Sequence, residues 1–163
     1  DGMLGAPISP ISLIMGEILF AGSKGFFFSF AVLAVIWMTG IISYPLSILT
    51  TIVGFITGLM FGTLSMFVTS FVRNINHFNF YFTGLISPMF FFSGVVFPVE
   101  NLPGYLRLAA EIIPLTHVVR MSRAFCVPGG LGMVMLYDLL YCIVFIAVTG
   151  WFAAGGLKKR MIV

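Results

Sequence analysis

Four long apolar stretches constrain the fold of this chain more than any other feature. They cover residues 25–43, 46–72, 78–97 and 133–157, and only the last contains a charged residue, Asp138, before its basic end. Crossing the roughly 30 Å hydrocarbon core of a bilayer takes about 20 helical residues that rise about 1.5 Å each. Each stretch is long enough, so the sequence predicts an all-α membrane protein with four transmembrane helices.

The overall composition agrees with a lipid environment. Hydrophobic residues make up 60% of the chain and charged residues 8%, whereas soluble domains are about 45–50% apolar and about 25% charged. So few charges cannot cover a water-exposed surface, and the excess of apolar side chains must face lipid. The basic residues are dispersed rather than clustered on one face, which argues against a nucleic-acid-binding protein.

The residues before the first stretch predict a separate helix. Ser9-Pro10 is a helix-start signal, with a capping serine followed by proline at the first helical position. Apolar residues then recur at helical spacing, at Ile11, Ile14, Ile18 and Leu19. We expect an amphipathic helix from Pro10 to Phe20 on the cytoplasmic membrane surface. The alternative is that this helix continues directly into the span at 25–43.

Positions of basic residues predict the orientation. Cytoplasmic loops carry an excess of Lys and Arg. With four spans the two ends of the chain face the same side, and five basic residues then lie inside: Lys24, Arg73, Lys158, Lys159 and Arg160. Three lie outside, namely Arg107, Arg120 and Arg123. The count favours a cytoplasmic C-terminus.

The segment at residues 98–132 predicts two short helices rather than a span. It is divided by prolines, which remove a backbone donor and start or stop helices, at Pro98, Pro103, Pro114 and Pro128. Its two apolar stripes are Leu102, Leu106, Ala109, Ala110 and Ile113, then Leu115, Val118, Val119, Ser122 and Phe125. Its charged residues would each cost about 2.5–3.5 kcal/mol at the centre of a span. We expect re-entrant amphipathic helices whose arginines extend to the lipid headgroups.

Two features within the spans concern helix packing. Gly54, Gly58 and Gly62 recur every four residues and line one helix face, where a neighbouring helix can approach closely. The neighbour belongs either to this chain or to a second copy. Ser87-Pro88 and Gly94 interrupt the third stretch, which predicts a kinked helix beside a conduit or a static bend.

Candidate chemical groups are sparse. His77 and His117 have no second ligand at metal-site spacing, and Asp138 is close enough to the predicted interface for solvation to account for it. No catalytic triad or zinc motif is present. Residues 22–25, Gly-Ser-Lys-Gly, lack the spacing of a phosphate-binding loop. We therefore expect no catalytic residue, metal or cofactor on this chain, and any ATP and magnesium on another subunit.

The run from Phe80 to Pro103, with F-S-G-V-V-F-P-V-E-N-L-P at its end, resembles the signature of type-2 ABC exporter permeases. These include nodulation lipo-oligosaccharide, daunorubicin-type drug and polysaccharide exporters, of which the nodulation type is nearest. Ile113 to His117, followed by Arg120, is similar to a second family segment. The opening stretch, from Ala6 through Ile18, resembles the cytoplasmic segment before the third family span.

The resemblance implies a role for each region. Family permeases have six spans, so residues 1–163 would form one N-terminally shortened permease domain holding spans three to six. Residues 6–20 would include the helix that couples to an ATPase subunit, with Pro7, Ile8, Ser9, Pro10 and Glu17 as coupling residues. A place near the translocation path is implied for Ser87, Pro88 and Gly94. The re-entrant segment, residues 99–125, would include or adjoin Pro98, Pro103, Pro114, His117 and Arg120.

The function implied is that of a membrane subunit of an ATP-driven exporter in the bacterial inner membrane. Two permease copies would pair with two ATPase subunits and move a lipid-linked saccharide, a polysaccharide or a hydrophobic drug out of the cytoplasm. A non-transporting membrane scaffold or assembly factor of the same fold is the alternative. An intramembrane enzyme is disfavoured, because the chain lacks an acid, base or nucleophile set. The residues alone leave the cargo, the direction of transport and the identity of the second permease open.

Overall fold

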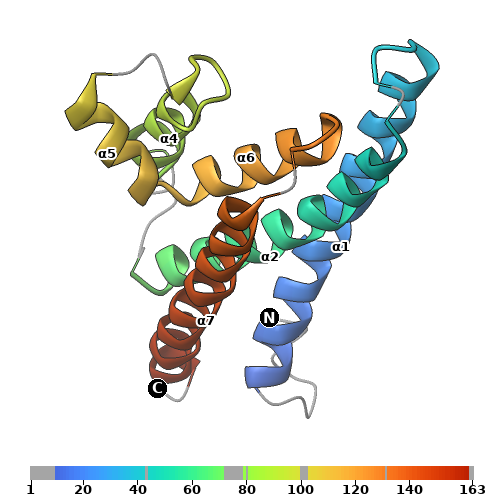
Figure 1. Ribbon diagram of the computed structural model, residues 1–163. Helices are drawn as coiled ribbons and strands as arrows, with labels where there is room; N and C mark the ends of the chain where they lie inside the picture. The colour runs from blue at the N-terminus through green and yellow to red at the C-terminus, as the bar shows by residue number, and fades with distance from the viewer. Residues whose placement is uncertain are drawn as a thin grey trace.

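The computed structural model describes residues 10–42, 44–71, 79, 81–99, 103–130 and 132–161. Every regular element in these ranges is helical, as Figure 1 shows. The elements are α1 (Pro10–Met38), η1 (Pro45–Leu49), α2 (Thr50–Phe71), η2 (Phe82–Ile86), α4 (Ser87–Phe92), α5 (Gly104–Ile112), α6 (Pro114–Cys126) and α7 (Met133–Met161). The short element η1 is a 3-10 helix, and η2 is a π-helix.

Within the described ranges, three helices are long and apolar enough to cross a membrane. They are Ile11–Met38, Pro45–Phe71 and Met133–Gly156, and they contain most of the predicted spans at 25–43, 46–72 and 133–157. Large apolar side chains point outward from them, such as Trp151, which is 81% exposed. Such surfaces suit a lipid solvent, and the predicted class, an all-α membrane protein, is confirmed.

The boundary predicted between Phe20 and the first span is wrong. Helix α1 continues without a break from Pro10 to Met38, so the alternative of one continuous helix is the one observed. Two polar side chains in this stretch find partners within the helix: Ser23 Oγ donates to the carbonyl of Leu19 at 3.0 Å, and Lys24 Nζ lies 4.3 Å from the centre of the Phe20 ring.

The third predicted span, residues 78–97, is only partly described. Its described part contains the π-helix η2 followed by α4, and its apolar helix Thr83–Phe92 is shorter than a span. The chain then turns at Ser93-Gly94, where Gly94 has a φ of 91°, in the region that glycine adopts most easily. Four spans therefore stay a prediction, of which three are represented by long helices.

Helices α1 and α2 pack along a seam of small residues. A Cβ added at Gly58 would collide with the carbonyl oxygen of Ala21, and one added at Gly54 would lie 2.8 Å from the carbonyl oxygen of Gly25. Gly62 also faces Ala21. The three predicted packing glycines thus face α1 of the same chain.

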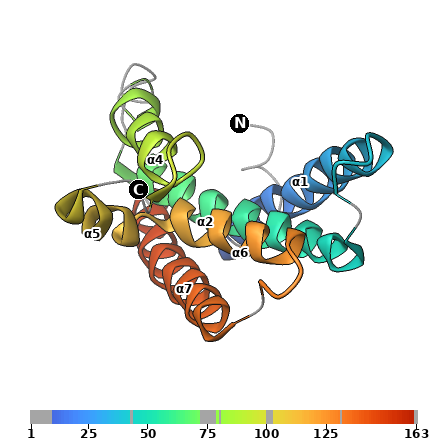
Figure 2. The same cartoon turned by 45° about the horizontal axis from the view of Figure 1, so that its top comes forward.

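Helix α6 packs against α2 and α7, and Figure 2 shows it lying over α2. The three helices enclose a small core. The core contains six buried residues from α2, α6 and α7: Val53, Met60, Val118, Met121, Phe125 and Cys142. Thr149 Oγ1 on α7 also donates to Thr63 Oγ1 on α2 at 2.8 Å. These contacts hold α2, α6 and α7 together as one unit.

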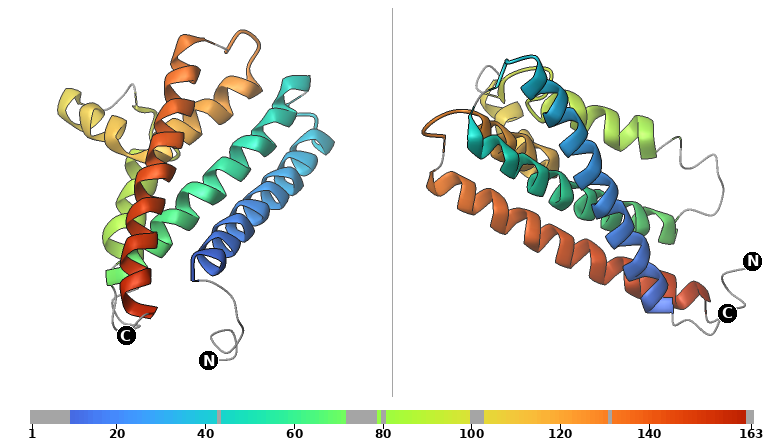
Figure 3. Two further views of the ribbon diagram at one scale, coloured as in Figure 1. Left: turned by 90° about the horizontal axis from the view of Figure 1, so that it is seen from below. Right: turned by 90° about the vertical axis from the view of Figure 1, so that its right-hand side faces the viewer.

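The start of α1 and the end of α7 lie at the same end of the molecule (Figures 1 and 3). The turn between α1 and α2 lies at the other end, together with α5 and α6. The charged segment predicted from the prolines is therefore separated from the basic end of α7 by the length of the long helices.

Candidate functional site

Prolines define the two helices of the charged segment. Helix α6 begins at Pro114, and Ile113 before it is extended, with φ −76° and ψ 119°. Residues before proline favour this conformation, so the chain breaks between α5 and α6 at the predicted place. The buried face of α6 differs from the predicted stripe. Val118 and Phe125 are buried as predicted, but Leu115, Val119 and Ser122 are only partly covered, and the remaining buried positions are Pro114, Thr116, His117 and Met121.

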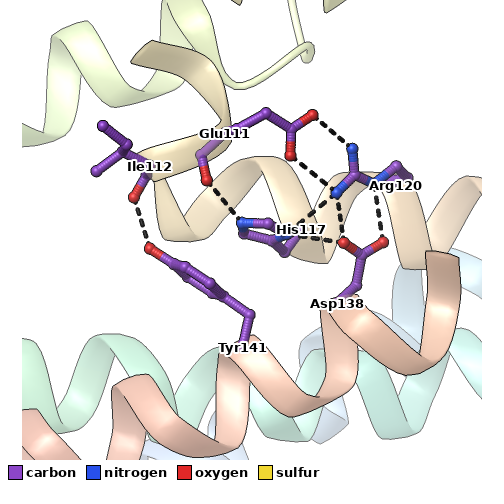
Figure 4. A network of polar contacts seen from close by, with 6 residues as sticks. All are labelled: Glu111, Ile112, His117, Arg120, Asp138 and Tyr141. Atoms are coloured by element: carbon purple, nitrogen blue, oxygen red, sulfur yellow. Dashed lines mark hydrogen bonds and ion pairs between the residues drawn. The ribbon is translucent and has the colours of Figure 1, made fainter. Parts of the chain in front are cut away.

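His117 and Asp138 form the centre of a buried polar network (Figure 4). His117 Nδ1 lies 2.7 Å from Asp138 Oδ1, and both residues are 0% exposed. Arg120 holds the same carboxylate from the other side: its Nε donates to Oδ2 at 2.8 Å and its Nη2 to Oδ1 at 2.5 Å. Charge-assisted and bidentate bonds of this kind are the stronger hydrogen bonds in proteins.

The same guanidinium also holds Glu111 on α5. Arg120 Nη1 donates to Glu111 Oε1 at 2.8 Å, and Nη2 donates to Oε2 at 3.1 Å. His117 Nε2 lies 2.9 Å from the main-chain carbonyl oxygen of Glu111. Arg120 and His117 on α6 thus join α5 to α7.

The Arg120 guanidinium lies between the two carboxylates of this network, those of Glu111 and Asp138. Hydrogen bonds from Arg120 hold the pKa of Glu111 below its ordinary value, although partial burial acts in the opposite direction. The two carboxylates hold the pKa of Arg120 above its ordinary value.

Tyr141 covers the network on the α7 side. Its ring stacks on His117, with centroids 3.9 Å apart and planes inclined by 26°. Its hydroxyl donates to the carbonyl oxygen of Ile112 at 2.6 Å, at the end of α5. The imidazole is therefore held by both nitrogens and one ring face.

Two expectations about the charged residues are wrong. Asp138 is not solvated near an interface but fully buried, since His117 and Arg120 replace water as its partners. Arg120 does not extend away toward headgroups, because both of its carboxylate partners lie within the protein. A buried charge in a membrane protein is expensive unless it is paired, and the pairing explains why this segment tolerates its charges.

Arg123 ties α6 to the turn after α4. Its Nη2 donates to the carbonyl oxygen of Gly94 at 2.6 Å. The positive φ of Gly94 shapes this turn, so Gly94 lies next to the charged helices rather than inside a helix. Ser87 and Pro88 lie further back, in the first turn of α4, directly after the π-helical turn η2.

The predicted coupling residues are divided. Pro7, Ile8 and Ser9 lie outside the described residues, whereas Pro10 begins α1 and Glu17 is exposed on its second turn. Pro98 follows the turn at Gly94, and Pro103 immediately precedes α5. The structure therefore brings together His117, Arg120 and Pro114, and keeps Glu17 apart from them.

Sequence reasoning missed Glu111, Arg123, Asp138 and Tyr141 as members of one site. A usable signal was present for Asp138, the one acid within a long apolar stretch. An acid in such a place needs a partner, and the charged segment before it offers His117 and Arg120. Tyr141, one turn after Asp138, carries no such signal.

The family model for the ABC-2 type transporter matches residues 2–126. The chain is also similar to Nodulation protein J of Sinorhizobium fredii, at 32% identity over 91% of this chain and 56% of that protein. Nodulation protein J of Rhizobium leguminosarum bv. viciae is 30% identical over 99% of this chain and 62% of its own length. Nodulation protein J of Rhizobium meliloti is 29% identical over 98% of this chain and 60% of its own length.

This chain thus spans less than two thirds of the length of these relatives. No solved structure matches it significantly. The family match covers α1 to α6, including Glu111, His117 and Arg120 of the polar network. With its long apolar helices and this family match, the chain is a multi-pass membrane protein that belongs to the ABC-2 type transporter family.

Proposed function

We propose that this chain is part of the transmembrane permease subunit of an ATP-driven exporter. The observation that carries the proposal is the family match over residues 2–126, on a chain whose long helices are apolar. The cargo would be a lipid-linked saccharide, a polysaccharide or a hydrophobic drug. The similarity to Nodulation protein J favours the first of these.

The energy source would be a separate ATPase subunit that binds ATP and magnesium. The printed sequence contains no phosphate-binding loop of the Walker type. A second permease copy would complete the translocation path, giving a complex of two permeases and two ATPases. The translocation path would then form at the interface between the two permease copies.

The membrane would be the bacterial inner membrane, with the end of α7 in the cytoplasm. The last turns of α7 carry Lys158, Lys159 and Arg160, and basic residues favour the cytoplasmic side. The start of α1 lies at the same end (Figure 3). Residues 6–20 would then face the ATPase, with Glu17 exposed for contact.

Helices α5 and α6 would lie at the outer membrane face as a re-entrant hairpin. The ion pairs of Arg120 with Glu111 and Asp138 support this placement. A paired arginine counts for less than a free one when basic residues on the two sides of the membrane are compared. The polar network would hold the hairpin on the outer end of α7. The hairpin would thereby bound the exit of the path.

The alternative is a membrane scaffold or assembly factor with the same fold. It differs in one measurable respect, since a scaffold needs no nucleotide hydrolysis. Affinity purification of the full-length protein from its own membranes, followed by mass spectrometry, distinguishes the two. We expect a Walker-type ATPase in amounts equal to the permease. Repeated recovery without any ATPase would contradict the exporter proposal and favour the scaffold.

A further inference from the structure

A polar hollow of about 240 Å³ lies between the turn after α4 and the helices α5 and α6. Among the described residues, three arginines line it, Arg107, Arg120 and Arg123, against one carboxylate, Glu111. Drug-sized ligands occupy pockets of about 300–1,000 Å³ that are mostly apolar. This hollow is smaller and more polar, so it suits a small anion or a headgroup better than a hydrophobic cargo.

The arginines are not equally available. All three side-chain nitrogens of Arg120 donate to Glu111 or Asp138. Arg123 uses one nitrogen, Nη2, for the carbonyl oxygen of Gly94. Arg107 is exposed and has no bonding partner within the part of the chain that the structure describes. Arg107 and Arg123 therefore keep donors for a ligand after Glu111 has been neutralised by Arg120.

A threonine supplies an independent observation. Thr116 lines the hollow and is 3% exposed. Among the described side chains, its hydroxyl is one of two that are buried without a hydrogen-bond partner, the other being that of Thr51. A buried hydroxyl without a partner costs free energy, and an oxygen-rich ligand in the hollow would remove that cost.

We propose that this hollow binds a phosphate group, with Arg107 and Arg123 contributing charge and Thr116 donating its hydroxyl hydrogen. Guanidinium groups match phosphate oxygens in geometry and charge. The phosphate comes either from a lipid headgroup of the surrounding bilayer or from a soluble phosphate ester. The site does not depend on export, so it can be tested apart from the proposed function.

The first test titrates sn-glycerol 3-phosphate into the purified full-length protein in uncharged detergent, with glycerol as the neutral counterpart. Arg107→Gln and Thr116→Val should each weaken binding of the phosphate ester about tenfold, the scale of a hydrogen bond to a charged group. Thr51→Val is the matched control. It removes the other unpartnered hydroxyl and lies outside the hollow, so binding should not change.

Thermal unfolding separates a binding role from a structural one. Without ligand, Thr116→Val should melt at the same temperature as the wild type or higher, because it removes an unpaired hydroxyl. Arg107→Gln should melt like the wild type, since this side chain is exposed. Weaker binding then reflects the ligand contact rather than a damaged fold.

Native mass spectrometry identifies the source of the phosphate. Retention of phosphatidylglycerol but not diacylglycerol, lost in Arg107→Gln and Thr116→Val, would assign the site to a lipid headgroup. Saturable binding of the soluble ester, weakened in both variants, would assign it to a soluble phosphate ester. Equal affinity for glycerol and its phosphate, or no change in either variant for either probe, would overturn the proposal.

Discussion

The Asp138 carboxylate on α7 meets the His117 imidazole on α6 at 2.7 Å, in a place that solvent does not reach. The two residues are 21 positions apart, and the turn between α6 and α7 lies between them. Because Arg120 holds the same carboxylate and also Glu111, one buried acid fixes both short helices to a long one. The placement of the charged hairpin therefore depends on Asp138.

Asp138→Asn should destabilise the protein by about 3–5 kcal/mol, the usual cost of breaking a buried ion pair from one side. Arg120 would keep its charge but lose its charged partner on α7, and the amide nitrogen would place a donor where Oδ2 now accepts from Arg120 Nε. The measurement is the melting temperature of the purified protein in detergent. Glu17→Gln removes an exposed carboxylate on α1 and should leave it unchanged. Equal melting temperatures of Asp138→Asn and the wild type would show that the polar network does not stabilise the fold.

The glycine seam makes a second prediction. Gly58→Ala should lower stability by about 1–3 kcal/mol, the cost of overpacking, because the new methyl group meets main-chain atoms of Ala21 and Gly22 that cannot rotate away. Gly16→Ala is the matched control, since a Cβ there meets nothing within 4 Å. That control should be neutral or stabilising by up to about 1 kcal/mol, as alanine favours helix. Unfolding in detergent measures the stability of both variants. Equal changes in stability would show that close packing at Gly58 does not stabilise the protein.

Low pH should weaken the link between α5 and α6. Arg120 holds the pKa of Glu111 below its ordinary 4.5. A group with a lowered pKa in the folded state stabilises the fold above its unfolded pKa, and this contribution is lost as the pH falls through the folded pKa. The melting temperatures of wild type and Glu111→Gln should therefore differ by a constant amount at neutral pH, with the wild type higher. The difference should narrow below about pH 4.5, and a widening there would contradict the assigned pairing.

The exposed start of α1 tests coupling. Glu17→Lys should uncouple ATP hydrolysis from export without loss from the membrane, because the side chain is exposed and its charge is reversed. Replacing Pro7-Ile8 with Gly-Gly should have the same effect. Glu17→Gln separates the effect of reversing the charge from that of losing it. We expect its transport per ATP hydrolysed to lie between the values of the wild type and Glu17→Lys. Hydrolysis and transport are measured together in vesicles, and normal transport in both altered proteins would exclude residues 6–20 from coupling.

The long helices were predictable because their signal is local. An apolar run of sufficient length has few folds other than a span or a buried helix. The seam was half predictable: Gly54, Gly58 and Gly62 repeat every four residues, and so do Ala21, Gly25 and Ser29 on the facing helix. The contact between the two repeats was not predictable, because the local sequence does not indicate which helices pack together.

The continuity of α1 was only the alternative prediction, for a related reason. Residues 17–24 include Glu17 and Ser23-Lys24, which locally indicate an interface or a break. The structure keeps one helix there, because Gly22 and Gly25 pack against α2 and Ser23 bonds within its own helix. Tertiary packing outweighed the local signal.

The polar network could not be assembled from spacing. Glu111, Arg120 and Asp138 lie on three helices, and each has an ordinary local explanation as a residue on a solvated face. Their meeting requires α5 and α6 to fold over the start of α7, which the core residues Val118, Met121 and Phe125 bring about. The apolar contacts of α6 therefore determine where the charges lie.

The most direct test of the account is the membrane side on which α5 lies relative to the end of α7. Single cysteines at Tyr105, which is 75% exposed, and at Lys159 are introduced into a full-length protein in which Cys126 and Cys142 are replaced. A membrane-impermeant maleimide is applied to intact spheroplasts and to opened ones. We predict labelling of Tyr105→Cys in intact spheroplasts and of Lys159→Cys only after opening. Labelling of both positions from the same side would contradict the account.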